Sequence, residues 1–199
     1  MDLFTPPDSK ASAAALEVCH RYTQPWLLNH SLRSYSWATA YAADVDIAHD
    51  GELLYVATLL HDLGLTAPFD SHTLQFEEAS AHVAWVFAAG AGWGPERRAR
   101  LAEVIVAHLG DDVSADDDPE SHLLQVAVGA DVSGRGLERF SERFVADVVE
   151  RFPRLGFADA FLVQAKDQAE RKPHCAAAGL MRDGWADRVS ANPLDQPSR

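Results

Sequence analysis

Residues 51–66 read GELLYVATLLHDLGLT, and this stretch indicates both the fold and its chemistry. An almost wholly apolar run at helical spacing leads directly into His61 and Asp62, and Gly64 follows. A buried imidazole and a buried carboxylate are each costly unless they are paired or bind a metal. Adjacent residues on a helix point about 100° apart, so they can share one ion only where the helix ends. The glycine places His61 and Asp62 at such an end.

The helical spacing of apolar residues continues through most of the chain. No β-hairpin dipeptide lies between alternating runs, so strand signals are nearly absent. We therefore predict an all-α protein built as one helical bundle. A first helix, capped by Ser9 or Ser12, is expected to end near Thr23. The other helices are expected at 29–43, 52–63, 75–89, 95–109, 119–132, 137–152 and 157–172, before a mixed final segment.

The length and charge of the chain limit its class. We expect a single domain over 1–199 with a flexible tail at 190–199. Lys and Arg total 17 and Asp and Glu total 30, so the net charge is −13. That charge opposes binding to a phosphate backbone, so no nucleic acid partner is expected. No apolar window is long enough for a membrane span. With no signal peptide visible either, we expect a cytoplasmic protein acting on a small molecule; whether it forms a homo-oligomer stays open.

Two further polar residues lie in helical surroundings. His30 stands in NHSLRSY near the start of the second expected helix, and Asp131 follows the apolar run VAVGA of the sixth. Together with His61 and Asp62, they provide two neutral imidazoles and two carboxylates. Such a set cancels the charge of a divalent cation and leaves positions open for water and substrate. This composition is typical of a catalytic rather than a structural metal site.

Each of these residues also has a purely structural interpretation. His61 can favour the negative end of the helix dipole, and Asp62 can cap the next loop. His30 can be a surface residue beside a helix cap, and Asp131 can anchor the turn at Gly134. The apolar residues that flank them favour metal ligands.

The ordered series of motifs resembles a known family. The order His, then His-Asp, then Asp on a helical chain is the signature of the HD-domain superfamily of metal-dependent hydrolases. The chain is more closely similar to the cyanamide hydratase-like branch, over about residues 26–173. The segments that carry this resemblance are NHSLRSY (29–35), LLHDLGLT (59–66), the FE at 76–77, VIVAH (104–108), VGADVSGRG (128–136), RFPRLGF (151–157) and AERKP (169–173).

The resemblance implies an all-α HD fold in which His30, His61, Asp62 and Asp131 bind a divalent transition metal. Zinc is the metal of the characterised hydratases, and iron, manganese, cobalt or nickel suit the same donors. The metal would lower the pKa of a bound water, and the hydroxide would attack an electrophilic carbon such as a nitrile-type C≡N. Cyanamide would become urea.

Hydration also requires a proton donor for the nitrogen that becomes negatively charged. The candidate catalytic residues for this step are His108, Glu77 and His82. Arg33 lies three residues after His30 and could either bind a substrate oxyanion or pair with a ligand carboxylate. Of the two roles, we favour the pairing with a ligand carboxylate.

Phosphomonoester hydrolysis, for example of a nucleoside monophosphate, is an alternative activity. It would need Arg33, and also Lys166 or Lys172, to neutralise the phosphate. Leu65 stands where nucleotidases of the HD class often carry an acid, which argues against this activity.

A di-iron oxygenase is the other alternative. His82 and His108 follow His61 by 21 and 47 residues, spacings similar to those of HD-type di-iron oxygenases. A second metal bound by His82 and His108 therefore stays open. An exposed pair of His82 with Glu78, four residues earlier, is the structural alternative. A regulatory domain without turnover is disfavoured by the complete set of ligand candidates.

Overall fold

The computed structural model describes residues 4–195, which form ten α-helices, three short 3-10 helices and no strand. The all-α prediction is therefore confirmed. The first six α-helices are α1 (Lys10–Tyr22), α2 (Pro25–Asp44), α3 (Gly51–Leu60), α4 (Phe76–Gly90), α5 (Pro95–Ala107) and α6 (Pro119–Ser133). The last four are α7 (Glu142–Arg151), α8 (Phe157–Arg171), α9 (Ala176–Arg182) and α10 (Trp185–Ser190). The 3-10 helices are η1 (Leu63–Leu65), η2 (Leu137–Arg139) and η3 (Pro193–Asp195).

Helix starts follow local side-chain chemistry, and they correct two of the expected boundaries. α2 begins at Pro25, four residues earlier than expected, because proline is tolerated in a first helical turn. His30 therefore lies inside the helix. The expected helix 137–152 is divided into η2 and α7, because the side chain of Ser141 accepts a hydrogen bond from the backbone amide of Phe144 and starts a new helix.

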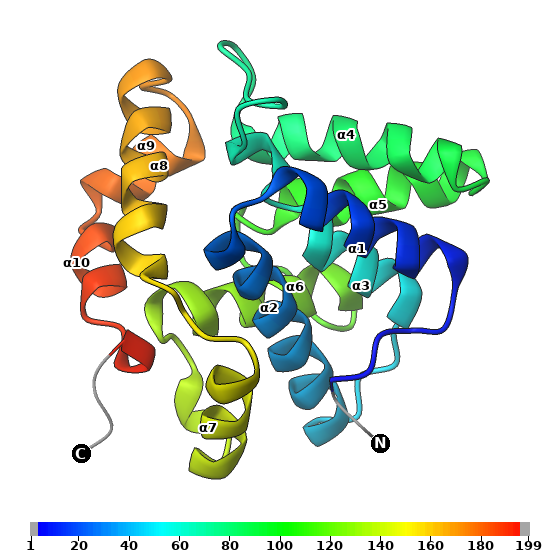
Figure 1. The fold of residues 1–199 in the computed structure, drawn as a ribbon, viewed down its shortest axis with the longest axis horizontal. Helices are drawn as coiled ribbons and strands as arrows, with labels where there is room; N and C mark the ends of the chain where they lie inside the picture. The colour runs from blue at the N-terminus through cyan, green and yellow to red at the C-terminus, as the bar shows by residue number, and fades with distance from the viewer. Residues whose placement is uncertain (1–3, 196–199) are drawn as a thin grey trace.

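The helices that carry the predicted ligands lie at the centre of the bundle (Figure 1). α2 packs along α6, and α3 contacts both of them. α4 and α5 pack along each other on one side, and α8, α9 and α10 pack together on the other. The arrangement brings the middle of α2, the end of α3 and the end of α6 close to one another.

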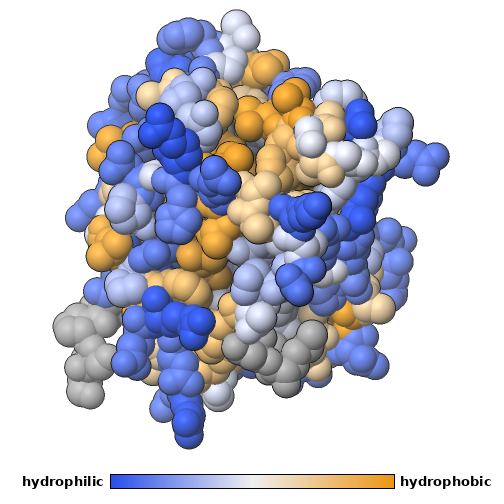
Figure 2. All heavy atoms as spheres, turned by 45° about the vertical axis from the view of Figure 1, so that its right-hand side comes forward, coloured by the Kyte–Doolittle hydropathy of each residue, from blue (hydrophilic) through white to orange (hydrophobic). Residues whose placement is uncertain are grey.

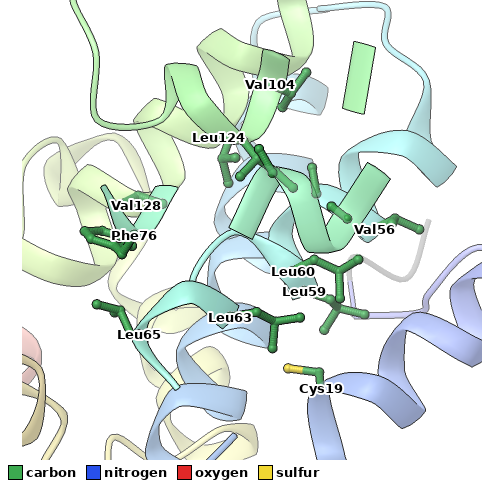
Figure 3. Packing of buried hydrophobic residues seen from close by; sticks show 14 of the residues in the cluster. Cys19, Val56, Leu59, Leu60, Leu63, Leu65, Phe76, Val104, Leu124 and Val128 are labelled. Carbon is green, nitrogen blue, oxygen red and sulfur yellow. The ribbon is translucent and has the colours of Figure 1, made fainter. Parts of the chain in front are cut away.

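Buried side chains hold the turn that follows α3. Leu59, Leu60 and Leu63 are at most 1% exposed, and Figure 3 shows them in the same cluster as Cys19 of α1 and Val56 of α3. Each fully buried leucine contributes roughly 1.5–3 kcal/mol of burial free energy. The turn is therefore fixed by packing on both sides of His61 and Asp62.

Hydrophilic side chains cover most of the face shown in Figure 2, with a band of apolar residues between them. None of the helices in residues 4–195 has the length and hydropathy needed to cross a membrane.

The C-terminal segment differs from its expected flexibility. Residues 190–195 are folded, because Ser190 ends α10 and η3 follows it. Asn192 is fully buried. The remainder of the predicted tail, 196–199, lies outside the described residues.

Gly64 provides a test of how tightly the turn packs on α4. A methyl group at this position would overlap the backbone carbonyl of Phe76, which cannot move cheaply. We expect Gly64→Ala to lower the free energy of unfolding by about 2 kcal/mol or more, measured by urea denaturation. Gly51→Ala is the matched control, because a methyl group there meets nothing within 4 Å. Equal stability of the two variants would contradict the close approach of the turn to α4.

Candidate metal centre

The first feature of the centre is a change of backbone direction at the end of α3. His61 caps the helix with helical dihedral angles, φ −61° and ψ −27°. Asp62 has already left the helix, with φ −109° and ψ 9°. The two neighbouring side chains can therefore point at one place, as the helix-end argument requires.

Three donor atoms converge there. His30 Nε2 lies 3.2 Å from His61 Nε2 and 3.4 Å from Asp62 Oδ2, and His61 Nε2 lies 3.3 Å from the same oxygen. All three residues are buried. Tetrahedral bonds of about 2.0–2.2 Å to zinc separate two donor atoms by about 3.3–3.6 Å. The observed separations therefore fit one face of a tetrahedral site.

The hydrogen bonds of the His30, His61 and His108 imidazoles determine which ring nitrogen is free to bind a metal. Each Nδ1 lies against an oxygen that can only accept, so Nδ1 carries the proton and Nε2 presents its lone pair. The bonds are 2.7 Å from His30 to Asp131 Oδ2, 2.9 Å from His61 to the Thr58 carbonyl and 2.5 Å from His108 to the Ile105 carbonyl. When both rings are neutral, two lone pairs face each other at 3.2 Å and repel. Burial lowers the pKa of His30, but its hydrogen bonds to Asp131 and Asp62 outweigh burial and raise that pKa, so either a proton on this ring or a metal cation between the rings removes the repulsion.

Asp62 supplies the negative charge that such a cation needs. Both of its carboxylate oxygens are buried without a hydrogen-bond partner. Burial alone would raise the pKa of Asp62, but the positive charge that His61 and His30 carry when protonated outweighs it and holds that pKa well below its ordinary value. A bound metal would take the place of that charge. A buried carboxylate without donors is costly unless a cation binds it. The residues therefore fit a divalent metal.

His108 is a fourth donor next to this group. It caps α5, its side chain is 1% exposed, and Nε2 lies 3.8 Å from Asp62 Oδ1. Burial is the main cause that lowers the pKa of His108 to about 4, and His61 adds to it when protonated, so the His108 ring is neutral at pH 7. The sequence placed His108 in catalysis or at a second metal. Its Nε2 lies next to Asp62 but outside the group of three donor atoms that lie within 4.8 Å of one another, so His108 is a candidate fourth ligand of that site.

Asp131 differs from its expected role as a ligand. Its Oδ1 accepts hydrogen bonds from Arg33 Nε at 2.7 Å and Trp37 Nε1 at 3.0 Å. Its Oδ2 accepts one from Arg33 Nη2 at 2.8 Å besides the bond from His30. The packing of α2 on α6 places these three donors around one carboxylate. Asp131 therefore stands behind His30 and orients its ring, with no oxygen left free for a metal.

The three cations that the sequence offered for a phosphate have other partners, whereas Arg135 and Arg188 line the cavity described below. Arg33 is fully buried and also donates to the carbonyls of Phe152 and Pro153, so it pairs with a carboxylate and does not face a substrate. Lys172 donates to two backbone carbonyls, those of residues 71 and 74. Lys166 lies on the surface beside Glu170. None of the three cations lines the cavity described below.

His82 is not brought to the centre. It lies on the exposed side of α4, in a groove that it lines together with Glu78 and Trp85. His108, by contrast, is buried and lines a different cavity. The side of α4 that carries His82 points away from the core, because another side of the helix, with Ala81 and Ala84, is buried. The pairing of His82 with His108 around a second metal is therefore not found.

Glu77 is a buried acid in the first turn of α4. It is 3% exposed, and its Oε2 has no hydrogen-bond partner. Burial is the main cause that raises the pKa of Glu77 to about 7, and the charges of Glu78 and Asp62 add to the effect. Glu77 does not line the cavity next to Asp62.

A small cavity opens onto the centre. Its volume is about 180 Å³, below the roughly 300–1,000 Å³ of drug-sized sites. Asp62 and His108 are part of its lining, Phe161, Leu180 and Trp185 from α8, α9 and α10 contribute apolar surface, and Arg135 and Arg188 contribute positive charge. Only a small molecule can reach the donors by this route.

The metal site can be tested with single variants. We expect purified wild-type protein to bind about one equivalent of Zn²⁺ and His61→Ala and Asp62→Asn to lose it, because each removes a converging donor. His82→Ala is the matched control and should bind as wild type does. Elemental analysis after removal of free metal provides the measurement. Retention of zinc by His61→Ala would contradict the site.

Glu77 predicts a pH-dependent stability. Its pKa lies at about 7 in the folded protein against an ordinary 4.5, so the folded state holds the proton more tightly. The resulting stabilisation is complete below pH 4.5 and is lost as the pH rises to about 7. We expect Glu77→Gln to gain up to about 3 kcal/mol in unfolding free energy relative to wild type between pH 4.5 and 8. Urea denaturation at both pH values measures it, and a pH-independent difference would refute the raised pKa.

Comparison with known proteins agrees with this geometry. The sequence profile of the HD domain matches residues 27–132, which include His30, His61, Asp62 and His108. Cyanamide hydratase DDI2 and cyanamide hydratase DDI3 of Saccharomyces cerevisiae are each 27% identical to the chain over 193 residues. These alignments cover 94% of this chain and 84% of each relative, so the homology is distant but nearly full-length. Because the profile covers more than half of the sequence, the chain belongs to the HD-domain family.

Proposed function

We propose that this protein is a metal-dependent hydratase that adds water to a small nitrile-type substrate of the cyanamide class. The observation that carries the proposal is the buried convergence of His30, His61 and Asp62, of which Asp62 lines a small cavity. The distant relatives named cyanamide hydratase support the choice of reaction.

The metal would be held by His30, His61, Asp62 and His108, and zinc suits three imidazoles and one carboxylate. When bound, it supplies a Lewis acid that lowers the pKa of water toward neutrality. The chain contributes the orientation of each donor, because the Nδ1 hydrogen bonds prevent the imidazole rings from turning.

The cavity determines which substrates can approach. Phe161, Leu180 and Trp185 offer an apolar surface that suits a compact, uncharged molecule. Gln125, the amide side chain in the lining, is already bonded to the backbone of residues 107, 111 and 113. Arg135 and Arg188 also line the cavity, so selection rests mainly on size.

Addition of water to C≡N forms a C–O bond. The triple bond becomes a double bond, so the nitrogen must take up a proton. Glu77 is the buried acid whose pKa of about 7 suits proton transfer at neutral pH. Because it does not line the cavity, we assign it proton supply through an intervening water. The first product is an imidic acid, C(OH)=NH, which becomes the amide when its oxygen loses a proton and its nitrogen gains one. From cyanamide, the corresponding isourea becomes urea.

The two other activities lack the groups that the sequence predicted for them. A phosphomonoesterase was expected to use Arg33, Lys166 and Lys172, which all have other partners, although Arg135 and Arg188 line the cavity. A di-iron oxygenase of the expected kind needs His82, which lies on the exposed face of α4.

Activity assays separate these possibilities. We expect zinc-loaded wild-type protein to convert cyanamide to urea and His61→Ala to be at least about 1,000-fold slower, since the activated water is lost with the metal. His82→Ala should retain wild-type activity. Urea release is measured in parallel with phosphate release from nucleoside monophosphates and with dioxygen uptake. Phosphate release without urea, or iron-dependent dioxygen uptake, would replace the proposed reaction.

A further inference from the structure

The backbone of Asp131 is supported by residues far along the chain. α6 ends two residues later, so the Asp131 carbonyl has no amide of its own helix to accept from. Arg154 Nη1 donates to it at 2.6 Å and Asn192 Nδ2 at 2.9 Å. Arg154 lies between α7 and α8, and Asn192 follows α10. The end of α6 is therefore completed by side chains from the last third of the chain.

Arg154 is held between two acids. Its Nη1 also lies 3.4 Å from Asp131 Oδ2, and its Nε and Nη2 bind the two carboxylate oxygens of Asp195 at 2.8 and 2.5 Å. The guanidinium is 6% exposed. A buried guanidinium needs a nearby counter-charge. Asp195 therefore neutralises part of the positive charge of Arg154, which would otherwise be neutralised by Asp131 alone.

The C-terminal segment approaches α6 closely enough to require a glycine. Gly134 has φ +75°, and a side chain there would meet Pro193 at 2.7 Å. Asn192 Oδ1 accepts the backbone amide of Leu194 at 2.9 Å, which turns the chain so that Asp195 can reach Arg154. Leu194 packs against the cluster that contains Trp37. Residues 192–195 are therefore fitted to the end of α6.

We infer that Asn192 and Asp195 are positioning residues of the metal centre, acting through Arg154 and Asp131 on the imidazole of His30. The inference rests on the proposed metal site. Asp131 accepts a hydrogen bond from His30 Nδ1, and the strength of that acceptor affects how well Nε2 binds a metal. If Asp195 loses its charge, Arg154 shifts toward Asp131 and weakens the acceptor. Residues 192–195 lie beyond the HD match, so the structure assigns this support to the chain's own C-terminal segment.

The test uses the full-length protein and two readouts of the metal itself. Asp195→Asn removes the charge and keeps the shape. We expect it to raise the dissociation constant for Zn²⁺ about 10-fold, as changes behind a ligand typically do. We also expect the visible absorption of the Co²⁺-loaded protein to shift. Asp167→Asn is the matched control, because Asp167 also accepts two hydrogen bonds from one arginine, but on the surface of α8.

Two truncations extend the test. A chain that ends at Ala191 should lose more Zn²⁺ affinity than Asp195→Asn, whereas a chain that ends at Asp195 should bind as wild type does. Lower thermal stability of Asp195→Asn with unchanged Zn²⁺ affinity and an unchanged Co²⁺ spectrum would overturn the inference and leave the proposed function intact. A wild-type protein that binds no Zn²⁺ would overturn both.

Discussion

The hydrogen bond between His30 Nδ1 and Asp131 Oδ2, 2.7 Å long and fully buried, is the contact on which the rest of the site depends. It joins α2 to α6 and turns His30 Nε2 toward His61 and Asp62. A buried carboxylate can be kept only with several donors around it. Arg33 and Trp37 supply them from the same helix as His30. One arrangement thus stabilises the bundle and orients a metal donor.

At two helix ends, an imidazole is likewise oriented by a hydrogen bond from its Nδ1. His61 and His108 each cap a helix, and each donates Nδ1–H to the carbonyl three residues earlier. The last carbonyls of a helix have no partner in their own helix, so a side chain at the cap satisfies one of them at little cost. Helix termination therefore provides both the position and the tautomer of these two imidazoles. Because α3 ends just before His61 and α5 ends just before His108, the positions of the helix ends determine the geometry of these two donors.

Much of this could be predicted from the sequence, where local rules decide the outcome. Apolar periodicity predicted the helices, and the run before His61 and Asp62 predicted a buried polar pair at a helix end. Asp131 was predicted to be buried, but its role depends on which side chains of α2 surround it. That depends on the register of α2 against α6, which no local pattern encodes. The prediction of His82 as a site residue failed for a different reason. Its spacing from His61 matched a known arrangement, but its side of α4 faces solvent.

The metal donors and the residues that support them come from different parts of the chain. The donors lie between residues 30 and 108, within the HD match, and their surroundings are dictated by burial. The apolar wall of the cavity comes from Phe161, Leu180 and Trp185, and the support behind Asp131 comes from Arg154, Asn192 and Asp195. These residues act through tertiary contacts with groups far away in sequence, so neither periodicity nor spacing identifies them. A terminal segment that looks like a polar tail in sequence can therefore be part of the centre, because its hydrogen-bond partners are buried groups that water cannot reach.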